Sequence, residues 1–427
     1  MSSKADTKNM NQEKKRKLKP KLRFPEFRDA GEWEEKKLLE VCDVNPSNEE
    51  LPEFFIYIDL ESVVAGKLMY KKKICKKDAP SRAQRLLKNG DVIYQVVRPY
   101  QRNNFLFNFD DRNNYVASTG YAQLRSFGVS EFLYQLIHTD TFVNKVIAKC
   151  TGSNYPAINS SDLAEINVVI PLYSEQQKIA DCLSSISDRI TLEAQKLDTL
   201  KAHKKGLMQQ LFPAEGETLP KLRFPEFRDA GAWKEKQLGD VTNFSSGGTP
   251  SKDIPEYWSG SIPWISASSM HNINIEKSDF NITESALKAG SRIAKKGSLL
   301  ILIRGSMLHR RIPIGIAMID VAFNQDVKSL LIVKKVDEYF LLYQLMAMES
   351  KLLDIVGETG IGAGKIDTDE LKRFLIHLPI GAEQQKIADC LSSLDELIAA
   401  QTQKIAALKT HKKGLMQQLF PSVEGVK

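Results

Sequence analysis

The chain of 427 residues carries one unit twice, and this duplication constrains its fold more than any other feature of the sequence. Residues 21–33 read KLRFPEFRDAGEW, and they recur 200 residues later with one change, Glu32 to Ala232. Two further motifs, EQQKIADCLSS and HKKGLMQQLFP, recur at an offset of 208 residues. They begin at residues 175 and 383, and at residues 203 and 411. We therefore expect two copies of one architecture, with about eight extra residues in the second.

The two copies differ in how closely their parts match. Residues 175–213 and 383–421 are identical at 27 of 39 positions, whereas the segments that precede them share little. Scattered landmarks nevertheless keep the register of these diverged segments. Arg85-x-x-Lys88-x-Gly90 matches Arg292-x-x-Lys295-x-Gly297, and Thr151-Gly152 matches Thr359-Gly360. Two similar helices therefore carry two diverged domains of one fold.

The matched segments have the apolar spacing of a long helix that packs along a narrow seam. Counting by threes and fours from Ile179 and from Ile387, eight of ten positions in each copy are apolar. A helix of about 37 residues would be about 55 Å long, and Pro213 and Pro421 would end it. We expect the two helices to pair antiparallel with each other and so to separate the two domains. Parallel pairing, and packing of each helix on its own domain, remain alternatives.

The diverged segments are typical of a mixed α/β fold of the α+β type. Short runs rich in β-branched residues predict strands at residues 91–97, 166–170 and 298–304. Helical spacing of apolar residues predicts helices at residues 131–148 and 338–356.

Positive charge is concentrated in a few places. The net charge is +7, and residues 1–20 hold seven basic and two acidic residues, which predicts a disordered basic tail. Residues 67–102 carry eleven basic residues and two acids, and residues 288–311 carry seven basic residues and no acid. These two regions overlap in register, which favours a pair of nucleic-acid surfaces over a solvated basic face.

Each basic region ends in a segment with side chains that can read bases. Residues 98–104 (RPYQRNN) offer arginine, glutamine and asparagine, which make paired hydrogen bonds to guanine or adenine edges. Residues 304–311 (RGSMLHRR) stand at the matching place with different side chains, so the two domains would read different sequences. The candidate DNA-binding residues are Lys71, Lys72, Lys73, Arg85, Lys88, Arg98, Tyr100, Gln101, Arg102, Asn103, Asn104, Arg292, Lys295, Lys296, Arg304, His309, Arg310 and Arg311.

Signatures of catalysis, metal binding and cofactor binding are missing from the sequence. Residues 357–366 (GETGIGAGKI) depart from a phosphate loop at Thr359 and Ile366, and the histidines have no metal-ligand spacing. The five cysteines form no CxxC, so we expect reduced thiols in the cytoplasm. No apolar run is long enough to predict a membrane span or a signal peptide. An unrecognised nuclease or methyltransferase, and a coiled-coil scaffold without DNA specificity, remain alternatives.

The order of these motifs resembles the DNA specificity subunit of type I restriction-modification enzymes. The resemblance rests on RFPEF…W, a variable domain, EQQKIA and a long helix, all repeated, and it covers residues 21–421. Residues 245–266 (SSGGTPS…YWSGSIPWIS) are similar to the opening of many target recognition domains of that family. The first copy departs at residues 45–54 (NPSNEELPEF), which suggests another domain subtype.

The resemblance implies that each variable domain reads half of a bipartite, asymmetric site in double-stranded DNA. Two modification subunits would dock on the helices and carry adenine methyltransferase chemistry, and restriction subunits would join them. S-adenosylmethionine, ATP and Mg²⁺ would bind those partners, and this chain would have no catalysis or cofactor of its own. The implied division is a tail (1–20), target recognition domains (21–174 and 221–382), spacer helices (175–213 and 383–421), a linker (214–220) and a C-terminal tail (422–427).

Overall fold

The computed structural model describes residues 18–47, 50–358 and 362–421. Most of the predicted basic tail, and the whole C-terminal tail at 422–427, lie outside these residues. The chain divides into two compact units. Unit 1 holds residues 1–194 and 403–427, and unit 2 holds residues 195–402.

Unit 1 contains two small sheets of the mixed α/β kind that the sequence predicts. One sheet includes a parallel pair, β3 and β10, and the other is antiparallel. The first sheet has the spatial order β6 (Lys72–Cys75), β3 (Phe54–Ile58), β10 (Tyr115–Ser118) and β7 (Ala83–Leu86). The second has the order β2 (Cys42–Val44), β11 (Tyr121–Ser126), β8 (Asp91–Gln95) and β9 (Phe105–Leu106). Two strand pairs accompany them: β1 (Glu34–Lys37) with β12 (Asn167–Ile170), and β4 (Val63–Val64) with β5 (Lys67–Leu68). The helices are α1 (Ser130–Leu136), α2 (Asp140–Lys149), α3 (Ser160–Ala164), the first half of α4 (Tyr173–Leu211) and the second half of α10 (Gly381–Leu419).

Unit 2 repeats this topology with different loops. Its parallel pair is β15 and β22, and its antiparallel sheet has one further strand, β16, which pairs parallel to β21. The first sheet has the spatial order β17 (Asn281–Ile282), β15 (Ile262–Ile265), β22 (Val321–Phe323) and β18 (Arg292–Ala294). The second, antiparallel apart from β16, has the order β14 (Thr242–Ser246), β23 (Val327–Ile332), β19 (Leu299–Leu302), β21 (Ile314–Ala317) and β16 (Asn274–Ile275). Smaller groups are β13 (Lys234–Gln237) with β26 (Leu375–Leu378), and β20 (Arg304–Gly305), β25 (Gly364–Ile366) and β24 (Val356–Glu358). The helices are α5 (Leu238–Val241), α6 (Glu284–Lys288), α7 (Glu338–Ala347), α8 (Glu349–Asp354), α9 (Thr368–Arg373), the second half of α4 and the first half of α10 (Gly381–Leu419).

The glycines that keep the two copies in register have a backbone reason to do so. Gly90 and Gly297 adopt φ angles of +89° and +85°, in the left-handed region that side chains other than glycine disfavour. Each makes the turn that leads into a fully buried strand, β8 or β19.

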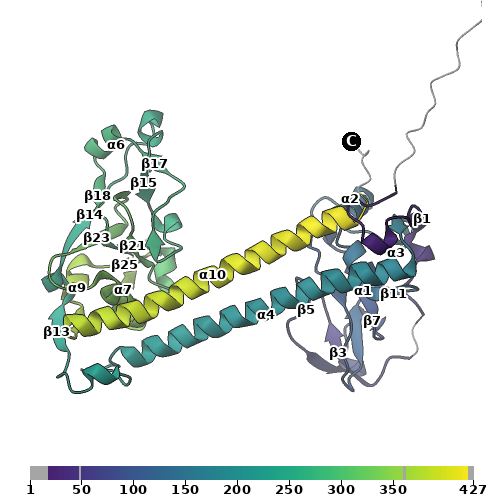
Figure 1. Ribbon diagram of the computed structural model, residues 1–427, viewed down its shortest axis with the longest axis horizontal. Coiled ribbons are helices and arrows are strands. Elements are labelled where there is room, and N and C mark those ends of the chain that lie inside the picture. The colour runs from purple at the N-terminus through teal and green to yellow at the C-terminus, as the bar shows by residue number, and fades with distance from the viewer. Residues whose placement is uncertain (1–17, 48–49, 359–361, 422–427) are drawn as a thin grey trace, which may run out of the picture. The chain divides into compact units, whose positions relative to one another are not determined.

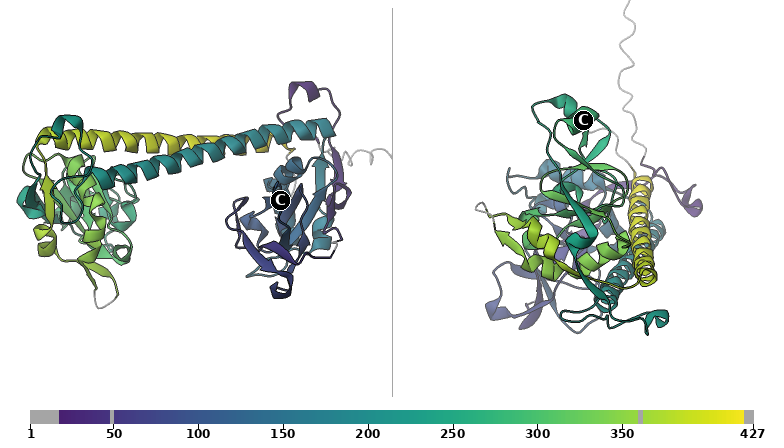
Figure 2. Two further views of the ribbon diagram at one scale, coloured as in Figure 1. Left: turned by 90° about the horizontal axis from the view of Figure 1, so that it is seen from below. Right: turned by 90° about the vertical axis from the view of Figure 1, so that its left-hand side faces the viewer.

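The two long helices are each 39 residues and are unbroken (Figures 1 and 2). Within each unit, half of one helix packs antiparallel on half of the other. In unit 1 Lys404 meets Glu193 at 2.6 Å, while Leu183 packs in one cluster with Leu419. In unit 2 Lys204 meets Asp395 at 2.6 Å. Antiparallel pairing, the arrangement that we expected, is therefore present within each unit.

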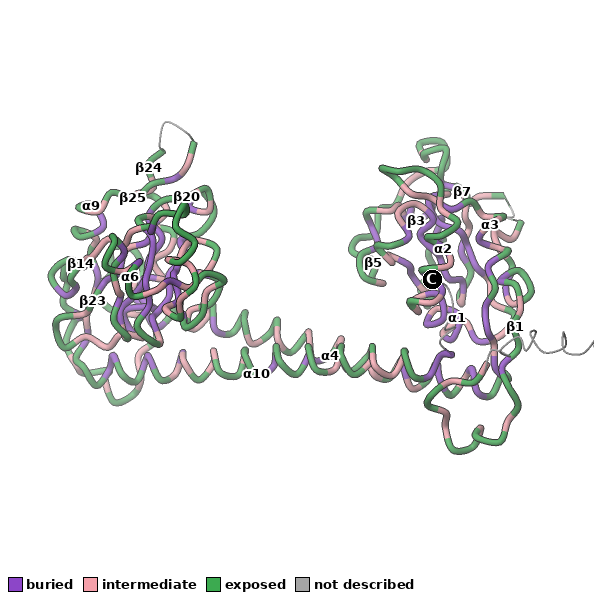
Figure 3. The backbone as a smooth tube through the Cα atoms, turned by 90° about the horizontal axis from the view of Figure 1, so that it is seen from above, coloured by how far each residue is buried: buried purple, intermediate pink, exposed green. Residues whose placement is uncertain are grey.

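The predicted seam is the buried stripe of these helices (Figure 3). All ten positions of each series are buried or half-buried, including the polar breaks. Glu193 is 5% exposed and Gln401 is 6% exposed, so the polar residues are part of the packed seam. No helix of the described residues is both long and apolar enough to cross a membrane.

Two segments that we predicted as single helices are each divided into two helices in the structure. Residues 131–148 form α1 and α2, because the Thr139 hydroxyl accepts a hydrogen bond from the backbone N–H of Phe142 and starts a new helix. Residues 338–356 likewise divide into α7 and α8 at Met348. Apolar spacing continued across both breaks, so periodicity alone did not reveal them.

Candidate nucleic-acid interface

Residues 98–104, called loop 1 below, leave the end of β8 and return in β9. Arg98 and Arg102 both adopt left-handed backbone angles, with φ of +54° and +55°, on either side of the turn Pro99–Gln101. The side chain of Gln95 holds the loop from beneath: its amide nitrogen donates to Gln101 Oε1 at 2.8 Å, and its Oε1 accepts from the Asn103 N–H at 3.1 Å. Loop 1 is thus a fixed platform.

Two side chains of loop 1 offer surfaces suited to nucleic acid. Tyr100 is 51% exposed. The Arg98 guanidinium lies 4.3 Å from the ring centroid of Tyr155, which is 64% exposed. Stacking of this kind orients a guanidinium and leaves its N–H edge available for hydrogen bonds.

The other polar side chains of loop 1 are already engaged inside the protein. Arg102 forms an ion pair with Asp140 at 2.7 Å and donates to the His138 carbonyl. Asn103 Oδ1 accepts from the Ala65 N–H at 3.1 Å. Asn104 is only 1% exposed, and its Oδ1 accepts from the Gln95 N–H at 2.8 Å. These residues shape the loop, and Asn104 has no surface for a base.

The basic residues that precede loop 1 lie on a different part of unit 1. Lys72 and Lys73 are exposed on β6, the edge strand of its sheet. Lys71 forms an ion pair with Asp111 at 2.9 Å and lies over the ring of Phe109.

Two more candidates flank the entry to β8. Burial lowers the pKa of Arg85, and its Nε has no hydrogen-bond partner among the described residues. The backbone N–H of Lys88 donates to Asp91 at 2.6 Å, in the turn before the strand. The predicted cluster is therefore a spread surface that includes an edge strand, a turn and loop 1.

Residues 304–311, called loop 2 below, occupy the matching place in unit 2. Arg304, Arg310 and Arg311 are exposed, and His309 Nε2 lies 3.1 Å from the Gly362 carbonyl. Arg304 pairs in register with Lys365 of β25. The remaining candidates lie on and after β18: Arg292 and Lys296 are exposed, and Lys295 pairs with Asp320 at 2.8 Å.

One pair of backbone hydrogen bonds gives the two loops equivalent positions. In unit 1 Ile158 N–H donates to the Val96 carbonyl at 3.1 Å. In unit 2 Ile366 N–H donates to the Ile303 carbonyl at 2.9 Å. The acceptor lies two residues before loop 1 in unit 1 and one residue before loop 2 in unit 2, and the donor in each case is the last residue of a second segment, Ile158 or Ile366. The register read from the sequence therefore corresponds to one framework that carries different side chains.

The segment that resembles a phosphate loop has another structure. Its described residues form the strands β24 and β25, and Lys365 pairs across to Gly357. Within the described parts of the chain, no three His, Cys, Asp or Glu side chains are grouped as a metal site would require.

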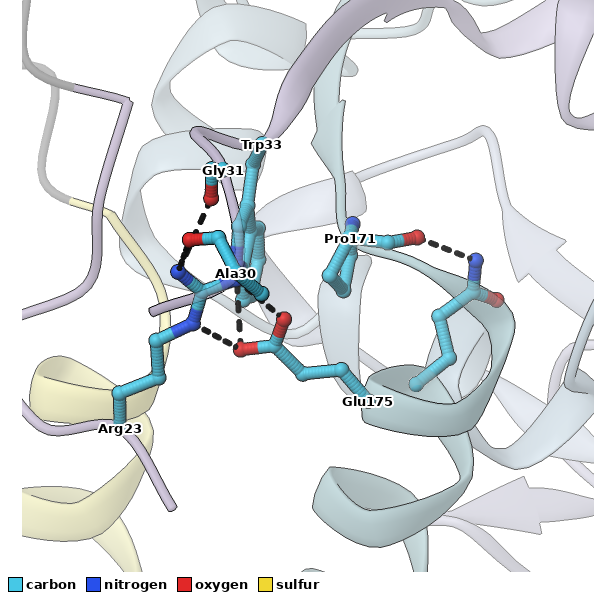
Figure 4. A network of polar contacts seen from close by, with 7 residues as sticks. Arg23, Ala30, Gly31, Trp33, Pro171 and Glu175 are labelled. Atoms are coloured by element: carbon cyan, nitrogen blue, oxygen red, sulfur yellow. Dashed lines mark hydrogen bonds and ion pairs between the residues drawn. The ribbon is translucent and has the colours of Figure 1, made fainter. Parts of the chain in front are cut away.

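The sequence reasoning missed a buried clamp that is built twice, and Figure 4 shows the copy in unit 1. Arg23 donates through Nε and Nη2 to the two carboxylate oxygens of Glu175 at 2.7 and 2.6 Å, and Trp33 Nε1 donates to the same carboxylate at 3.3 Å. Arg223, Glu383 and Trp233 repeat these contacts in unit 2. The clamp fixes the RFPEF segment on the helix that follows each domain. The signal for it was the near-identity of two motifs that are distant in sequence.

Comparison with known proteins agrees with this duplicated architecture. A family model described as "Type I restriction modification DNA specificity domain" matches residues 30–202 and again residues 231–410. The two matches cover most of the chain and coincide with its two repeats. The chain therefore belongs to the family of type I restriction-modification DNA specificity proteins.

Individual relatives match over shorter stretches. The specificity subunit of the type I restriction enzyme EcoR124I/EcoR124II of Escherichia coli is 32% identical over 164 residues, which are 38% of this chain and 41% of that protein. The MjaIX specificity subunit of Methanocaldococcus jannaschii is 36% identical over 174 residues, which are 39% of this chain and 38% of that protein. The chain thus aligns with about two fifths of the length of each.

A solved structure matches the fold over nearly the whole chain. The crystal structure of the type I restriction-modification S subunit from M. genitalium is 15% identical with a TM-score of 0.62, and the match covers 95% of this chain and 100% of that one. At this identity the likeness concerns the fold alone.

Proposed function

We propose that the chain is the DNA sequence-specificity subunit of a type I restriction-modification complex, in which each domain reads one half of a bipartite, asymmetric site in double-stranded DNA. The observation that carries this proposal is the equivalent placement of loop 1 and loop 2. Both follow a buried strand and are tied by the same backbone hydrogen bond, yet their side chains differ. A shared frame with different polar groups is what two readers of different sequences require.

We assign the two half-sites to different residues. Arg98, Tyr100 and Gln101 would contact the first half-site, and Arg304, Arg310 and Arg311 the second. The exposed lysines on β6 and Lys296 would contact phosphates, because lysine acts as a point charge without a base-reading geometry. Asn104 is left out of this assignment because it is buried.

Partner docking is supported by apolar residues that are exposed at matching places in the two repeats. Leu172 is 63% exposed and Ile380, 208 residues later, is 56% exposed, each beside the start of a long helix. Leu22 and Leu222 are 40% and 39% exposed. Two equal surfaces suit two copies of one partner, which we propose to be the modification subunit. Restriction subunits would join through that assembly.

Catalysis would lie on those partners. We propose that methyl transfer from S-adenosylmethionine, and ATP- and Mg²⁺-dependent reactions, take place on the modification and restriction subunits in the cytoplasm. We also propose the domain division read from the sequence, with recognition domains at residues 21–174 and 221–382 and spacer helices at 175–213 and 383–421.

Methylation profiling of genomic DNA tests the proposal directly. Cells that carry the modification subunit are compared with and without this chain. We expect methylated adenines in one bipartite motif only when the chain is present, and exchange of residues 221–382 for those of another specificity protein should change one half of that motif. If the methylation pattern does not depend on the chain, the proposal is wrong.

Docking has its own test. We expect Leu172→Glu and Ile380→Glu each to remove one modification subunit, and the double variant to remove both, as measured by native mass spectrometry. Met69→Glu, at a position of unit 1 that is 60% exposed and follows β5, serves as a control that should retain both. Full assembly of the double variant would refute the assigned surface.

A further inference from the structure

A basic groove of about 1050 Å³ in unit 1 joins loop 1 to the last turns of α10. Tyr100, Gln101 and Arg102 line one side, and Lys409, Lys412 and Lys413 line the other. Five basic residues and a single acid, Asp140, border the groove. Since Asp140 pairs with Arg102, the lysines of α10 are left as the free positive charge.

The three lysines share one face of α10. Lys412 and Lys413 follow Lys409 by three and four residues, so both lie on the side of the helix that carries Lys409, one turn further on. The corresponding lysines of α4 line a smaller groove of about 680 Å³ in unit 2, beside Arg311 of loop 2. The HKKG motif of each repeat therefore lines a groove next to the recognition loop of the other repeat.

The two grooves differ in the state of their central lysine. In unit 2 Lys204 is 9% exposed and contacts both carboxylate oxygens of Asp395 at 2.6 Å. Tyr343 also donates to Asp395 at 2.7 Å, and its ring lies 4.8 Å from the Lys204 ammonium. An internal acid thus neutralises this lysine.

The matching lysine in unit 1 has no such acid. The residue that corresponds to Asp395 is Ser187, whose hydroxyl donates to the Leu183 carbonyl in its own helix at 2.7 Å. The described residues place no carboxylate within ion-pair distance of Lys412, and burial lowers its pKa. His138, which lines the same groove, supplies no countercharge, because burial lowers its pKa to about 4 and the ring is neutral at pH 7. Lys412 is therefore a half-buried cation that lacks a counterion.

We infer that the groove of unit 1 is a sequence-independent site for the DNA backbone, in which Lys409, Lys412 and Lys413 hold a phosphate beside loop 1. This inference rests on the proposed function, and it adds to that function a contact from the helix outside the recognition domain. A phosphate supplies the missing charge, and the flexible lysine stems suit a phosphate better than a base edge. Tyr100 and Gln101 of loop 1 line the opposite wall, so a phosphate held by the lysines would lie beside the side chains that we assign to the first half-site.

The salt dependence of DNA binding tests the site. The full chain, alone and with its modification subunit, is titrated with several unrelated labelled duplexes over about 0.05 to 0.4 M salt. We expect Lys412→Met to weaken binding to every duplex by the same factor and to reduce the slope of log K against log salt by about 0.9, the value for one phosphate contact. Over the eightfold salt range of the titration, this change of slope corresponds to about a sixfold change in relative affinity. Lys412→Arg should restore the wild-type slope.

The second repeat supplies a matched control. The double variant Lys204→Met/Asp395→Leu removes the neutralised pair of unit 2 and should leave the slope unchanged. Lys413→Gln, at an exposed position, should reduce the slope without a risk to folding.

Three results would overturn the inference. The first is an unchanged slope in Lys412→Met while the wild-type chain binds DNA. The second is weaker assembly with the modification subunit at an unchanged slope, which would make the groove a surface for an acidic protein. The third is a wild-type chain that binds no duplex, which would overturn the proposed function as well.

Discussion

Removing the carboxylate of the buried clamp should destabilise one unit and spare the other. In Glu175→Gln the negative charge is lost and one of the two oxygens that accept from Arg23 becomes an amide nitrogen, while the shape of the side chain and one acceptor oxygen remain. The Arg23 side chain is 9% exposed and that of Glu175 is 1% exposed, so the arginine would be left as a buried, unpaired cation. Breaking such a pair costs about 3–5 kcal/mol. The carboxylate raises the pKa of Arg23 in the native chain. An arginine keeps its proton in proteins even without such a partner, so loss of a proton would not relieve the cost in the variant.

Hydrogen exchange in increasing urea gives the free energy of opening of each unit separately, which a single melting curve of a two-unit chain does not. We expect peptides from β8 and β11 to lose about 3–5 kcal/mol of protection in Glu175→Gln, while peptides from β19 and β23 remain unchanged. Glu383→Gln should give the reverse pattern. The double variant Arg23→Met/Glu175→Met should recover most of the loss, because an apolar pair can replace a buried ion pair. A loss below about 1 kcal/mol, or an equal loss in both units, would refute the reasoning.

Four further outcomes are expected. If Arg98 contacts a base, Arg98→Ala should weaken DNA binding by about 1–3 kcal/mol at one half-site only, as measured in an anisotropy titration. An equal loss of affinity for all duplexes would make Arg98 a phosphate contact. His138 has a pKa of about 4 in the folded chain and of about 6.5 when unfolded. As the pH falls, the unfolded state therefore takes up the proton first. The free energy of unfolding should decrease between about pH 6.5 and pH 4, by up to about 3 kcal/mol. Urea unfolding of His138→Gln should lack this loss, while exposed His203→Gln should retain it. One added heptad in both α4 and α10 lengthens each helix by about 10.5 Å, which equals roughly three base pairs of DNA, and should lengthen the spacer between the two halves of the methylated motif. A spacer of unchanged length would contradict a role of the helices in spacing. Calorimetry should detect no saturable binding of S-adenosylmethionine or ATP to the isolated chain, and a measurable affinity for either would contradict the assignment of catalysis to the partners.

The sequence was most informative where the chain repeats itself. The duplication predicted two domains of one topology, and the apolar spacing predicted both long helices, because a seam of 39 residues leaves many independent positions to count. It also placed loop 1 and loop 2 in register, since Gly90 and Gly297 keep the same left-handed turn before each loop.

The sequence could not predict which polar side chains are free. Asn104 and Gln101 belong to the same RPYQRNN run, yet Asn104 is buried and holds the backbone of Gln95. The partners of Arg102 and Lys71, Asp140 and Asp111, lie about 40 residues away in sequence, and no local pattern links them. Side-chain pairing of this kind depends on the tertiary fold. For the same reason the grooves lined by the HKKG motifs could not be predicted from either repeat alone.

The division of each long helix between the two units has a consequence for synthesis on the ribosome. Unit 2 is one continuous segment, residues 195–402, and can complete its fold while the chain is still being made. The core of unit 1 includes Leu419 and Phe420, which pack with Trp33 and Phe132. At roughly 5–20 residues per second, these side chains emerge about 10–45 s after the first 194 residues. The first domain to be translated is therefore the last to be finished, and a nascent chain that stops near residue 402 would have an intact second unit and an uncovered first one.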